Sequence, residues 1–279
     1  MKTQLAVFVV FLALVGGTAP GVLAAEDHDG YLALGDSVPF GFNPLVTLAQ
    51  RANPSVFVGY PEAYAAMREL TVTNLACPGE TSGSMIATPT PANPDNGCRR
   101  YRSRFPLHTS YSGPQLAFAL AYLQAHPNTA LITLSIGHND LSLLEKACNN
   151  DTACELDGLP NMLRRLDQNL RTIYAALRGV GYEGSIVAVT YYAADYRDAT
   201  EVRLISEVDR VLARVTRSFD GDVADGYRAF RRTAIHFDGS SCAAGLMIVL
   251  TQSPLGCDFH PTPAGRGLLA GALARVVDG

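Results

Sequence analysis

Residues 31–37 read YLALGDS, and the architecture of the protein can be worked out from this stretch. Its first four side chains suit a buried strand, and Gly35, Asp36 and Ser37 follow at once as a turn. The same order, a short apolar run and then glycine or polar residues, recurs along the chain. The pattern predicts five strands, at residues 31–34, 72–75, 131–136, 186–191 and 222–224.

The segments between these strands have the apolar spacing of helices. Several of them carry proline near the start, and they cover residues 61–70, 113–124, 159–178, 201–218 and 263–277. Strands that alternate with helices indicate βαβ units on a parallel sheet. We therefore expect a three-layer α/β/α sandwich around a central, mostly parallel five-stranded sheet. Because no repeat or long linker divides residues 26–279, we expect them to form a single domain.

The segment Met85–Tyr111 does not follow this pattern. It contains four prolines, shows no periodicity and carries a basic cluster, Arg99, Arg100, Arg102 and Arg104. Such a segment is expected to be a long loop, and long loops are often functional. The arginine cluster fits a solvated face as well as contact with an anionic substrate group.

Composition excludes several classes of function. The chain has 279 residues, of which 48% are hydrophobic and 17% are charged, so a globular core is expected. Its 22 basic and 26 acidic residues give a net charge of -4, which argues against nucleic acid as the main partner. Neither lysine, Lys2 or Lys146, stands in a P-loop. We expect no nucleotide chemistry and no cofactor.

Residues 1–25 have the form of a signal peptide. Lys2 is followed by an apolar run over residues 5–15 and then by small residues up to Ala25. The run is shorter than the ~20 residues that a membrane-spanning helix needs. We expect a secreted, extracellular or periplasmic protein that is monomeric and has no integral membrane segment after cleavage.

Six cysteines in an exported chain are expected to form disulfides. No Cys-x-x-Cys occurs and no two histidines stand four residues apart, so we expect no metal site. Each cysteine has a near neighbour across a loop rich in proline, glycine or asparagine. Our hypothesis is therefore sequential pairing: Cys77–Cys98, Cys148–Cys154 and Cys242–Cys257.

Chemistry-bearing residues follow the predicted strands, where open α/β sheets bind their ligands. GDS at 35–37 follows the first strand, CPGET at 77–81 the second and GHND at 137–140 the third, and CDFHP stands at 257–261. A serine at a strand-to-helix turn is a candidate nucleophile, because helix N-terminal amides lie where an oxyanion would form.

Taken together, these blocks resemble the SGNH hydrolases, also called GDSL esterases and lipases. The resemblance covers nearly the whole mature chain and rests on Ser37, Gly79, Asn139 and His260, and YLALGDS is similar to the secreted bacterial branch. No Gly-x-Ser-x-Gly elbow occurs, which counts against an ordinary α/β-hydrolase. The resemblance implies a carboxylic ester hydrolase with a flavodoxin-like fold.

The resemblance also implies roles for individual residues. Ser37 is then the nucleophile, His260 is the general base, and the oxyanion hole consists of the Ser37 and Gly79 main-chain N–H groups and the Asn139 side chain. Asp36 and Asp140 flank this site and are expected to hold its loops as caps. His236, with Asp238 nearby, is the main rival to His260 as base.

The third member of a catalytic triad is less certain on this pattern. The family places an aspartate three residues before the histidine, whereas this chain has Cys257 there and Asp258 one residue later. Either Asp258 reaches the imidazole ring, or the Cys257 carbonyl orients the ring and Asp258 caps the last helix. The displaced aspartate slightly favours the second arrangement, a dyad.

Three functions remain open at this point. A secreted esterase or lipase acting on small-molecule or lipid esters is the leading interpretation, a carbohydrate O-deacetylase acting on acylated sugars is the second, and a non-catalytic exported binding module is the third. The catalytic blocks do not distinguish the substrates. Four aromatic residues fit either an acyl pocket or the core: Phe40, Phe42, Tyr191 and Tyr192.

Overall fold

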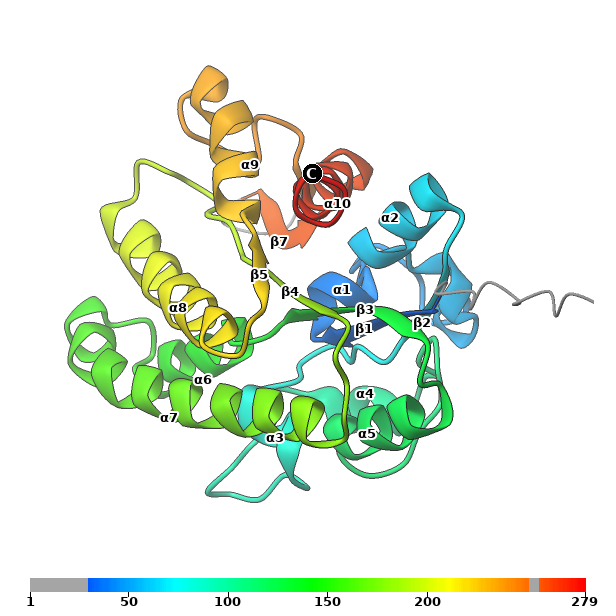
Figure 1. Cartoon of the computed structure of the whole chain (residues 1–279). Helices are drawn as coiled ribbons and strands as arrows, with labels where there is room; N and C mark the ends of the chain where they lie inside the picture. Colours follow the sequence, from blue (N-terminus) through cyan, green and yellow to red (C-terminus); the bar gives the residue numbers. More distant parts are fainter. Residues whose placement is uncertain (1–29, 251–255) are drawn as a thin grey trace, which may run out of the picture.

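The computed structural model describes residues 30–250 and 256–279. Its centre is a five-stranded sheet in the order β2-β1-β3-β4-β5, and every neighbouring pair is parallel (Figure 1). The strands are β1 Gly30–Gly35, β2 Thr71–Asn74, β3 Thr129–Ser135, β4 Ser185–Val189 and β5 Asp222–Ala224. The predicted α/β/α architecture is confirmed, and each predicted strand agrees with an observed one to within two residues.

Helices cover both faces of the sheet. One layer holds α2 (Tyr60–Arg68), α9 (Gly226–Ala234) and α10 (Pro263–Val277), which contact one another around α10. The other layer holds α5 (Gln115–Ala125), α7 (Thr152–Gly179) and α8 (Ala199–Arg217), and Figure 1 shows the two layers above and below the strands. None of the described helices combines the length and apolar character needed to cross a bilayer.

The strand order places a crevice at the centre of the sheet. The chain moves outward from β1 to β2 and then returns to the other side of β1 to form β3, so the direction of winding reverses between β1 and β3. Ligands of open α/β sheets bind at such a point, outside the carboxyl ends of the strands. Two short helices begin there, α1 (Ser37–Phe40) after β1 and α6 (His138–Ala147) after β3.

Two helical predictions need correction. The segment Met85–Tyr111 is not one continuous loop, because it contains the end of α3 (Ser82–Ile86) and all of α4 (Cys98–Arg102). Helix α7 begins at Thr152 rather than at Leu159, and Pro160 lies inside it. The Asp151 side chain caps this start by accepting from Cys154 N, and a disulfide from Cys148 to Cys154 spans the cap.

The sequence patterns did not predict the hairpin that precedes the last helix. Strands β6 (Met247–Val249) and β7 (Cys257–Pro261) pair antiparallel, outside the main sheet. Three 3-10 turns also occur: η1 (Gln50–Ala52), η2 (Pro54–Val56) and η3 (Ile235–Phe237). The predicted signal peptide, residues 1–25, lies outside the described residues.

A glycine-rich stretch also lies far from the crevice. Residues 179–184, GVGYEG, have the Gly-x-Gly-x-x-Gly spacing of a dinucleotide-binding loop. In the structure they join the end of α7 to the start of β4, whereas such a loop joins a strand to the following helix. This stretch therefore lies at the amino end of its strand and does not indicate a nucleotide site.

Candidate active site

Ser37 is the first residue of α1, directly after β1. The turn that exposes it depends on Gly35, which has a φ of +131° and at which a Cβ would overlap the Ser135 main-chain oxygen. Asp36 then caps the helix, because its Oδ1 accepts from Val38 N at 2.9 Å. The local sequence thus fixes the serine at the carboxyl edge of the sheet.

His260 reaches the same edge from the β6–β7 hairpin. Its Nδ1 is paired with Asp258 Oδ1, and its main-chain N–H donates to the same oxygen at 3.0 Å. Burial alone would raise the pKa of Asp258, but the hydrogen bonds and charge of His260 outweigh it and lower that pKa. The Phe42 ring packs edge-on to the imidazole with 4.9 Å between centroids. The imidazole is therefore held by a carboxylate on one side and an aromatic ring on another.

This arrangement corrects the dyad that the displaced aspartate favoured. Asp258, not the Cys257 carbonyl, faces the ring nitrogen. Asp258 does not cap the last helix either, because Thr262 does so by accepting from Gly265 N. A residue two positions before the histidine reaches its ring here because both lie on the irregular hairpin strand β7, whose register shifts against β6.

Gly79 lies in the turn after β2 with a φ of +86°. A Cβ at this position would lie 2.6 Å from the Asn96 oxygen and 2.9 Å from Cys98 N. The Gly79 carbonyl in turn accepts from Asn96 N at 2.8 Å. The close approach of two backbone segments therefore requires glycine here, independently of any catalytic role.

Asn139 lies at the start of α6 and is buried. Its Oδ1 accepts from Asn96 Nδ2 at 2.7 Å, and its Nδ2 makes a long contact of 3.4 Å with Asp36 Oδ2. The same Asp36 oxygen accepts from the Tyr191 hydroxyl at 2.5 Å. Burial raises the pKa of Asp36 to about 6, against the lowering effect of that hydroxyl.

These elements enclose one cavity of about 840 Å³. Ser37, Gly79 and His260 line it, whereas Asn139 does not and touches it only through Asn96. The remaining wall carries aromatic and aliphatic side chains and three arginines: Phe42, Leu48, Tyr101, Phe105, Arg51, Arg100 and Arg104. Segments far apart in the sequence thus place a hydroxyl, an imidazole and a glycine amide on one hollow.

Comparison with known families agrees with this geometry. The model of the GDSL-like lipase/acylhydrolase family matches residues 33–268, which include the end of β1 and the whole β6–β7 hairpin. This chain belongs to the GDSL-like lipase/acylhydrolase family. No curated protein sequence matches it.

Solved structures share the fold of this GDSL-family chain at low sequence identity. A phospholipase A1 from Streptomyces albidoflavus superposes with a TM-score of 0.57 at 17% identity, over 88% of this chain and 98% of the other. An acetylxylan esterase from Geobacillus stearothermophilus gives a TM-score of 0.53 at 15% identity, over 88% and 93%. At such identities the likeness concerns the fold.

Disulfides close the loops that carry two of the candidate residues. Cys77 is bonded to Cys98, Cys148 to Cys154 and Cys242 to Cys257, the three sequential pairs. The first bridge ties the Gly79 turn to α4, and the third ties the His260 strand to the loop after η3. Both bridges therefore limit the movement of catalytic-edge loops.

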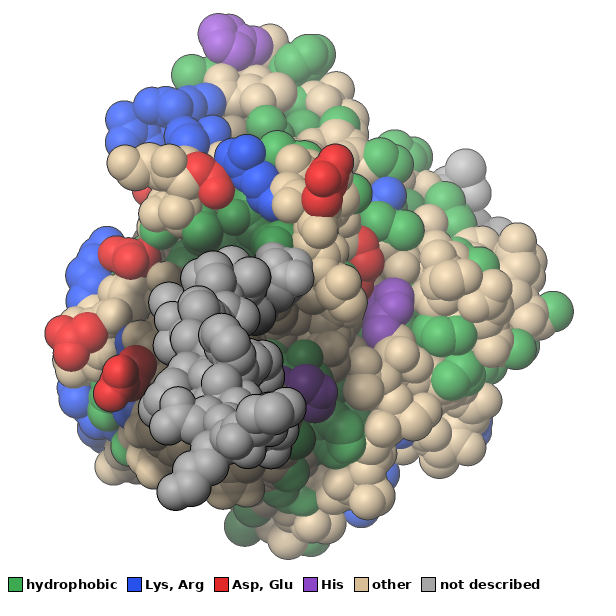
Figure 2. Space-filling view, turned by 45° about the vertical axis from the view of Figure 1, so that its right-hand side comes forward, with side chains coloured by type: hydrophobic (Ala, Val, Ile, Leu, Met, Phe, Trp, Pro, Cys, Tyr) green, Lys and Arg blue, Asp and Glu red, His purple; other side chains and the backbone are tan. Residues whose placement is uncertain are grey.

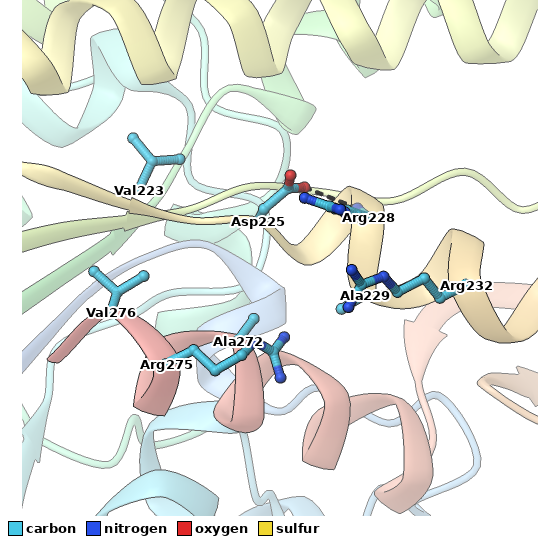
Figure 3. A pocket seen from close by; sticks show the side chains of 8 residues that line it. All are labelled: Val223, Asp225, Arg228, Ala229, Arg232, Ala272, Arg275 and Val276. Carbon is cyan, nitrogen blue, oxygen red and sulfur yellow. Dashed lines mark hydrogen bonds between the residues drawn. The ribbon is translucent and has the colours of Figure 1, made fainter. Parts of the chain in front are cut away.

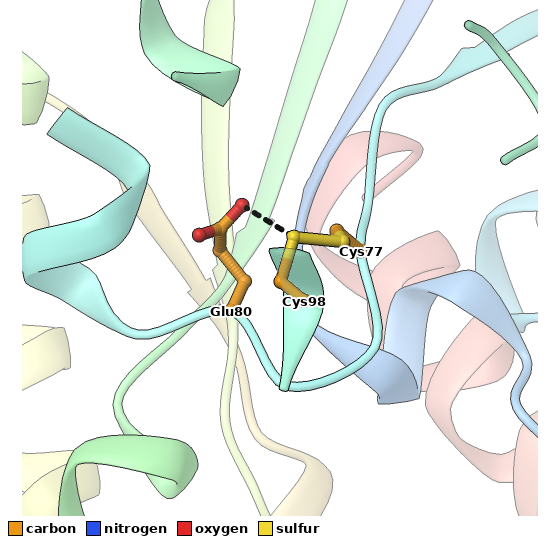
Figure 4. A group of neighbouring side chains, drawn as sticks. All are labelled: Cys77, Glu80 and Cys98. Carbon is orange, nitrogen blue, oxygen red and sulfur yellow. Dashed lines mark hydrogen bonds between the residues drawn. A yellow bond between two sulfur atoms is a disulfide. The ribbon is translucent and has the colours of Figure 1, made fainter. Parts of the chain in front are cut away.

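Glu80 is buried beside the first bridge (Figure 4). Its carboxylate accepts from Ser84 Oγ and from Gln115 Nε2 and lies 3.5 Å from Cys98 Sγ, which has no proton to donate. Burial raises the pKa of Glu80 to about 7. In the described part of the chain, Cys77, Cys98 and Glu80 are the one group close enough together for a metal, but both sulfur atoms are taken up by the bridge.

Of the other candidate residues, one lines the cavity and the rest lie elsewhere in the structure. Phe42 lines the cavity, whereas Phe40, Tyr191 and Tyr192 are buried in the core. His236, the rival base, lies on η3 and is not part of the cavity wall. Asp140 holds α3, because it accepts from Ser82 N at 2.9 Å and from the Ser82 hydroxyl.

Two residues of the site were missed from the sequence. Asn96 links Gly79 to Asn139, and Tyr191 donates to Asp36. Asn96 belongs to the segment expected to be a loop, where no periodic pattern assigns it a neighbour. Tyr191 is the last residue of the strand predicted at 186–191 and was assigned only to an acyl pocket or the core, so the part that was missed is its contact with Asp36.

Proposed function

We propose that this protein is a secreted serine esterase or lipase that hydrolyses carboxylic esters through an acyl-enzyme on Ser37. The observation that carries the proposal is the shared cavity, which Ser37 and His260 line together. Asp258 pairs with Nδ1 of the His260 ring and not with the second ring nitrogen, Nε2. Membership of the GDSL-like lipase/acylhydrolase family supports the same reaction class.

In the first half-reaction, Ser37 Oγ attacks the ester carbonyl carbon while His260 Nε2 takes the hydroxyl proton. Asp258 stabilises the imidazolium that forms. The negative oxygen of the tetrahedral intermediate accepts from the Ser37 and Gly79 main-chain N–H groups. Asn139 Nδ2, which contacts Asp36 in the structure, joins as the third donor when its side chain turns toward the cavity. The ester C–O bond then breaks, and the alcohol leaves with the proton from His260.

In the second half-reaction, water attacks the acyl-Ser37 carbonyl carbon and gives a proton to His260. The second tetrahedral intermediate collapses, the bond to Ser37 Oγ breaks, and His260 returns the proton to that oxygen. The carboxylic acid is released and the enzyme is restored. Every step uses groups of this chain and one water molecule, so the cycle requires no cofactor.

The cavity favours acyl chains longer than acetyl. Its volume of about 840 Å³ and its aromatic wall exceed what an acetyl group would fill. On this observation, a lipase-like role ranks above a carbohydrate O-deacetylase.

The first experiment measures hydrolysis of p-nitrophenyl esters from acetyl to palmitoyl, with Ser37→Ala as control. We expect a maximum at medium or long chains and a loss of at least about 10⁴-fold in kcat for Ser37→Ala. Activity that falls steeply beyond acetyl would instead support the deacetylase. No Ser37-dependent turnover of any ester would leave the non-catalytic binding module as the better explanation.

We also propose that residues 1–25 are a signal peptide and that residues 26–279 form the mature, monomeric enzyme. The three disulfides support an oxidising destination. The amino-terminal sequence of the protein recovered from outside the producing cell should begin close to Ala25 or Glu26. An uncleaved amino terminus would contradict the proposal.

A further inference from the structure

The charge of the cavity wall is unusual for this protein. The chain as a whole is acidic, with a net charge of -4, yet the cavity beside Ser37 is lined by Arg51, Arg100 and Arg104. Among the described residues, no aspartate or glutamate lines this cavity. The positive charge is thus a local property of the wall and does not follow from the overall composition.

The four arginines of α4 and the turn that follows it are divided between two cavities. Arg100 and Arg104 are four residues apart and face Ser37, whereas Arg99 and Arg102 are three apart and line a separate cavity with Glu80 and Asp95. Arg102 has a structural role there, because it donates to the Tyr111 and Gly113 carbonyls and stacks on the Tyr111 ring at 4.2 Å. Only half of the cluster therefore faces the candidate active site.

Arg51 is held in place as a fixed positive charge. Its Nε donates to the Val46 carbonyl at 3.1 Å, and its guanidinium carbon lies 5.2 Å from the Phe42 ring centre and 5.8 Å from that of Phe105. Phe42 is also the ring that packs against His260. One aromatic ring thus separates the Arg51 charge from the candidate base.

None of these three arginines is neutralised within the protein. In residues 30–250 and 256–279, no salt bridge joins Arg51, Arg100 or Arg104 to a carboxylate. Three guanidinium groups around one hollow repel one another, and an oxyanion that accepts from them would relieve this repulsion. Guanidinium groups bind phosphate and carboxylate with paired hydrogen bonds.

Apolar surface continues from the same cavity toward solvent. Tyr101 and Phe105 pack with 5.4 Å between ring centres, and Leu48 at the wall is 69% exposed. Leu45 in the same segment is 61% exposed. Exposed leucines beside a charged hollow suit a ligand that is itself partly apolar and partly charged.

We infer that the substrate of this cavity is an acyl ester of an anionic amphiphile, whose apolar chain lies on the aromatic wall and whose phosphate or carboxylate group binds Arg100, Arg104 and Arg51. The inference rests on the proposed function, because it names the substrate class of the same Ser37 site. It adds a specificity-determining role for Arg100 on α4 and for Arg104 in the turn after it.

The test compares short-chain esters that differ in charge, below their micellar concentrations. The substrates are dihexanoyl phosphatidic acid, zwitterionic dihexanoyl phosphatidylcholine and neutral p-nitrophenyl hexanoate. The double variant Arg100→Gln/Arg104→Gln removes two charges from the Ser37 cavity. The matched control, Arg228→Gln/Arg232→Gln, removes two charges from a separate arginine-lined cavity between α9 and α10.

The measured quantity is kcat/KM for the anionic ester divided by kcat/KM for the zwitterionic one. We expect the unmodified protein to prefer the anionic ester and the Arg100→Gln/Arg104→Gln variant to lose about 10-fold or more of this ratio, chiefly through KM. The control variant should keep the ratio, and added salt should lower it in the unmodified protein.

Three results would overturn the inference. Equal rates on the anionic and zwitterionic esters would do so, as would an equal loss of the ratio in both variants. A preference that appears only with phosphatidylglycerol vesicles would place the charge effect at a lipid surface, outside the cavity. If Ser37-dependent turnover of p-nitrophenyl hexanoate is present, these results refute only the substrate class. If it is absent, the proposed function itself fails.

Discussion

Two cavities of this protein are lined by three arginines each, but they differ in volume, in position and in their other lining residues. The larger, about 840 Å³, holds Ser37 and His260 at the carboxyl edge of the sheet. The smaller, about 230 Å³, lies between α9 and α10 and is lined by Arg228, Arg232 and Arg275 (Figure 3). Figure 2 shows Lys and Arg side chains gathered at the top of the molecule, over α9.

The described wall of the smaller cavity offers no side chain that could serve as a nucleophile in ester hydrolysis. Its described wall contains one carboxylate, Asp225, and otherwise alanine, valine and arginine, with no hydroxyl, thiol or imidazole. Asp225 caps α9 by accepting from Arg228 N at 2.8 Å. Arginines alone therefore do not distinguish a reactive hollow from a charged surface. The difference lies at the carboxyl edge of the sheet, where a serine hydroxyl and an imidazole line one wall.

The largest expected effect comes from exchanging the carboxylate that pairs with His260, and the carboxylate of the smaller cavity serves as its control. Asp258→Asn should lower kcat by about 10⁴-fold, because the variant no longer stabilises the imidazolium of His260. Asp225→Asn should leave kcat unchanged, because asparagine caps a helix as well as aspartate does. Steady-state kinetics on a medium-chain p-nitrophenyl ester measures both. A loss of only a few-fold for Asp258→Asn would contradict the orienting role of this carboxylate.

A smaller effect is expected from the glycine that shapes the catalytic wall. Gly79→Ala places a methyl group against Asn96 and Cys98 and should shift the oxyanion donor, lowering kcat by about 10²- to 10³-fold. Gly113→Ala is the matched control. Gly113 also has a positive φ, +74°, but its added Cβ would meet no atom within 4 Å.

Both glycine variants carry the strain of a left-handed backbone, about 1–2 kcal/mol. Thermal unfolding should therefore show destabilisation in both, and the kinetic loss should be confined to Gly79→Ala. Similar kcat losses in the two variants would mean that strain, rather than the position of the Gly79 amide, limits the rate.

The smallest expected effect is on the pH dependence of stability, where a buried carboxyl is compared with an exposed one. Glu80 behind the catalytic cavity is 2% exposed, and burial raises its pKa from 4.5 to about 7. Between these values the native state binds a proton that the unfolded chain does not. The stabilisation is complete below pH 4.5 and is lost as the pH rises through 7, and it amounts to at most about 3 kcal/mol.

The measurement is the free energy of unfolding at pH 5 and at pH 7.5. The unmodified protein should be more stable at pH 5, and Glu80→Gln should reduce the difference while keeping the contact with Ser84. The exposed Glu183 supplies the control, because Glu183→Gln does not remove a buried carboxyl. An unchanged difference in Glu80→Gln would assign the pH dependence to other buried groups.

The sheet was predictable from the sequence because each buried parallel strand has a short run of apolar residues. Strands β1 and β3 lie at the centre, and their residues are almost all buried. Helices α1, α3, α4, α6 and α9 were not predicted, because a helix of one to three turns depends on caps and packing more than on periodicity. The hairpin β6–β7 was missed because its second strand, Cys257–Pro261, is mostly half-buried and does not read as an apolar run.

The candidate site shows the same division. Ser37, Gly79, Asn139 and His260 follow from local motifs at strand ends and from the family resemblance. The orientation of Asp258 does not, because adjacent positions in an irregular strand decide it. The separation of Arg100 and Arg104 from Arg99 and Arg102 depends on α4 and the turn after it, and it could not be predicted once this segment was expected to be a loop.

The position of the hairpin along the chain determines when hydrolytic capacity can arise during biosynthesis. Ser37 leaves the ribosome more than two hundred residues before Asp258 and His260. The hairpin is then anchored by the Cys242–Cys257 bridge and by the Tyr192 hydroxyl, which donates to the Phe259 carbonyl at 2.8 Å. A nascent chain thus carries a serine without its base. On the proposed mechanism, the lipids and metabolites of the producing cell therefore meet only an inert precursor until synthesis is complete.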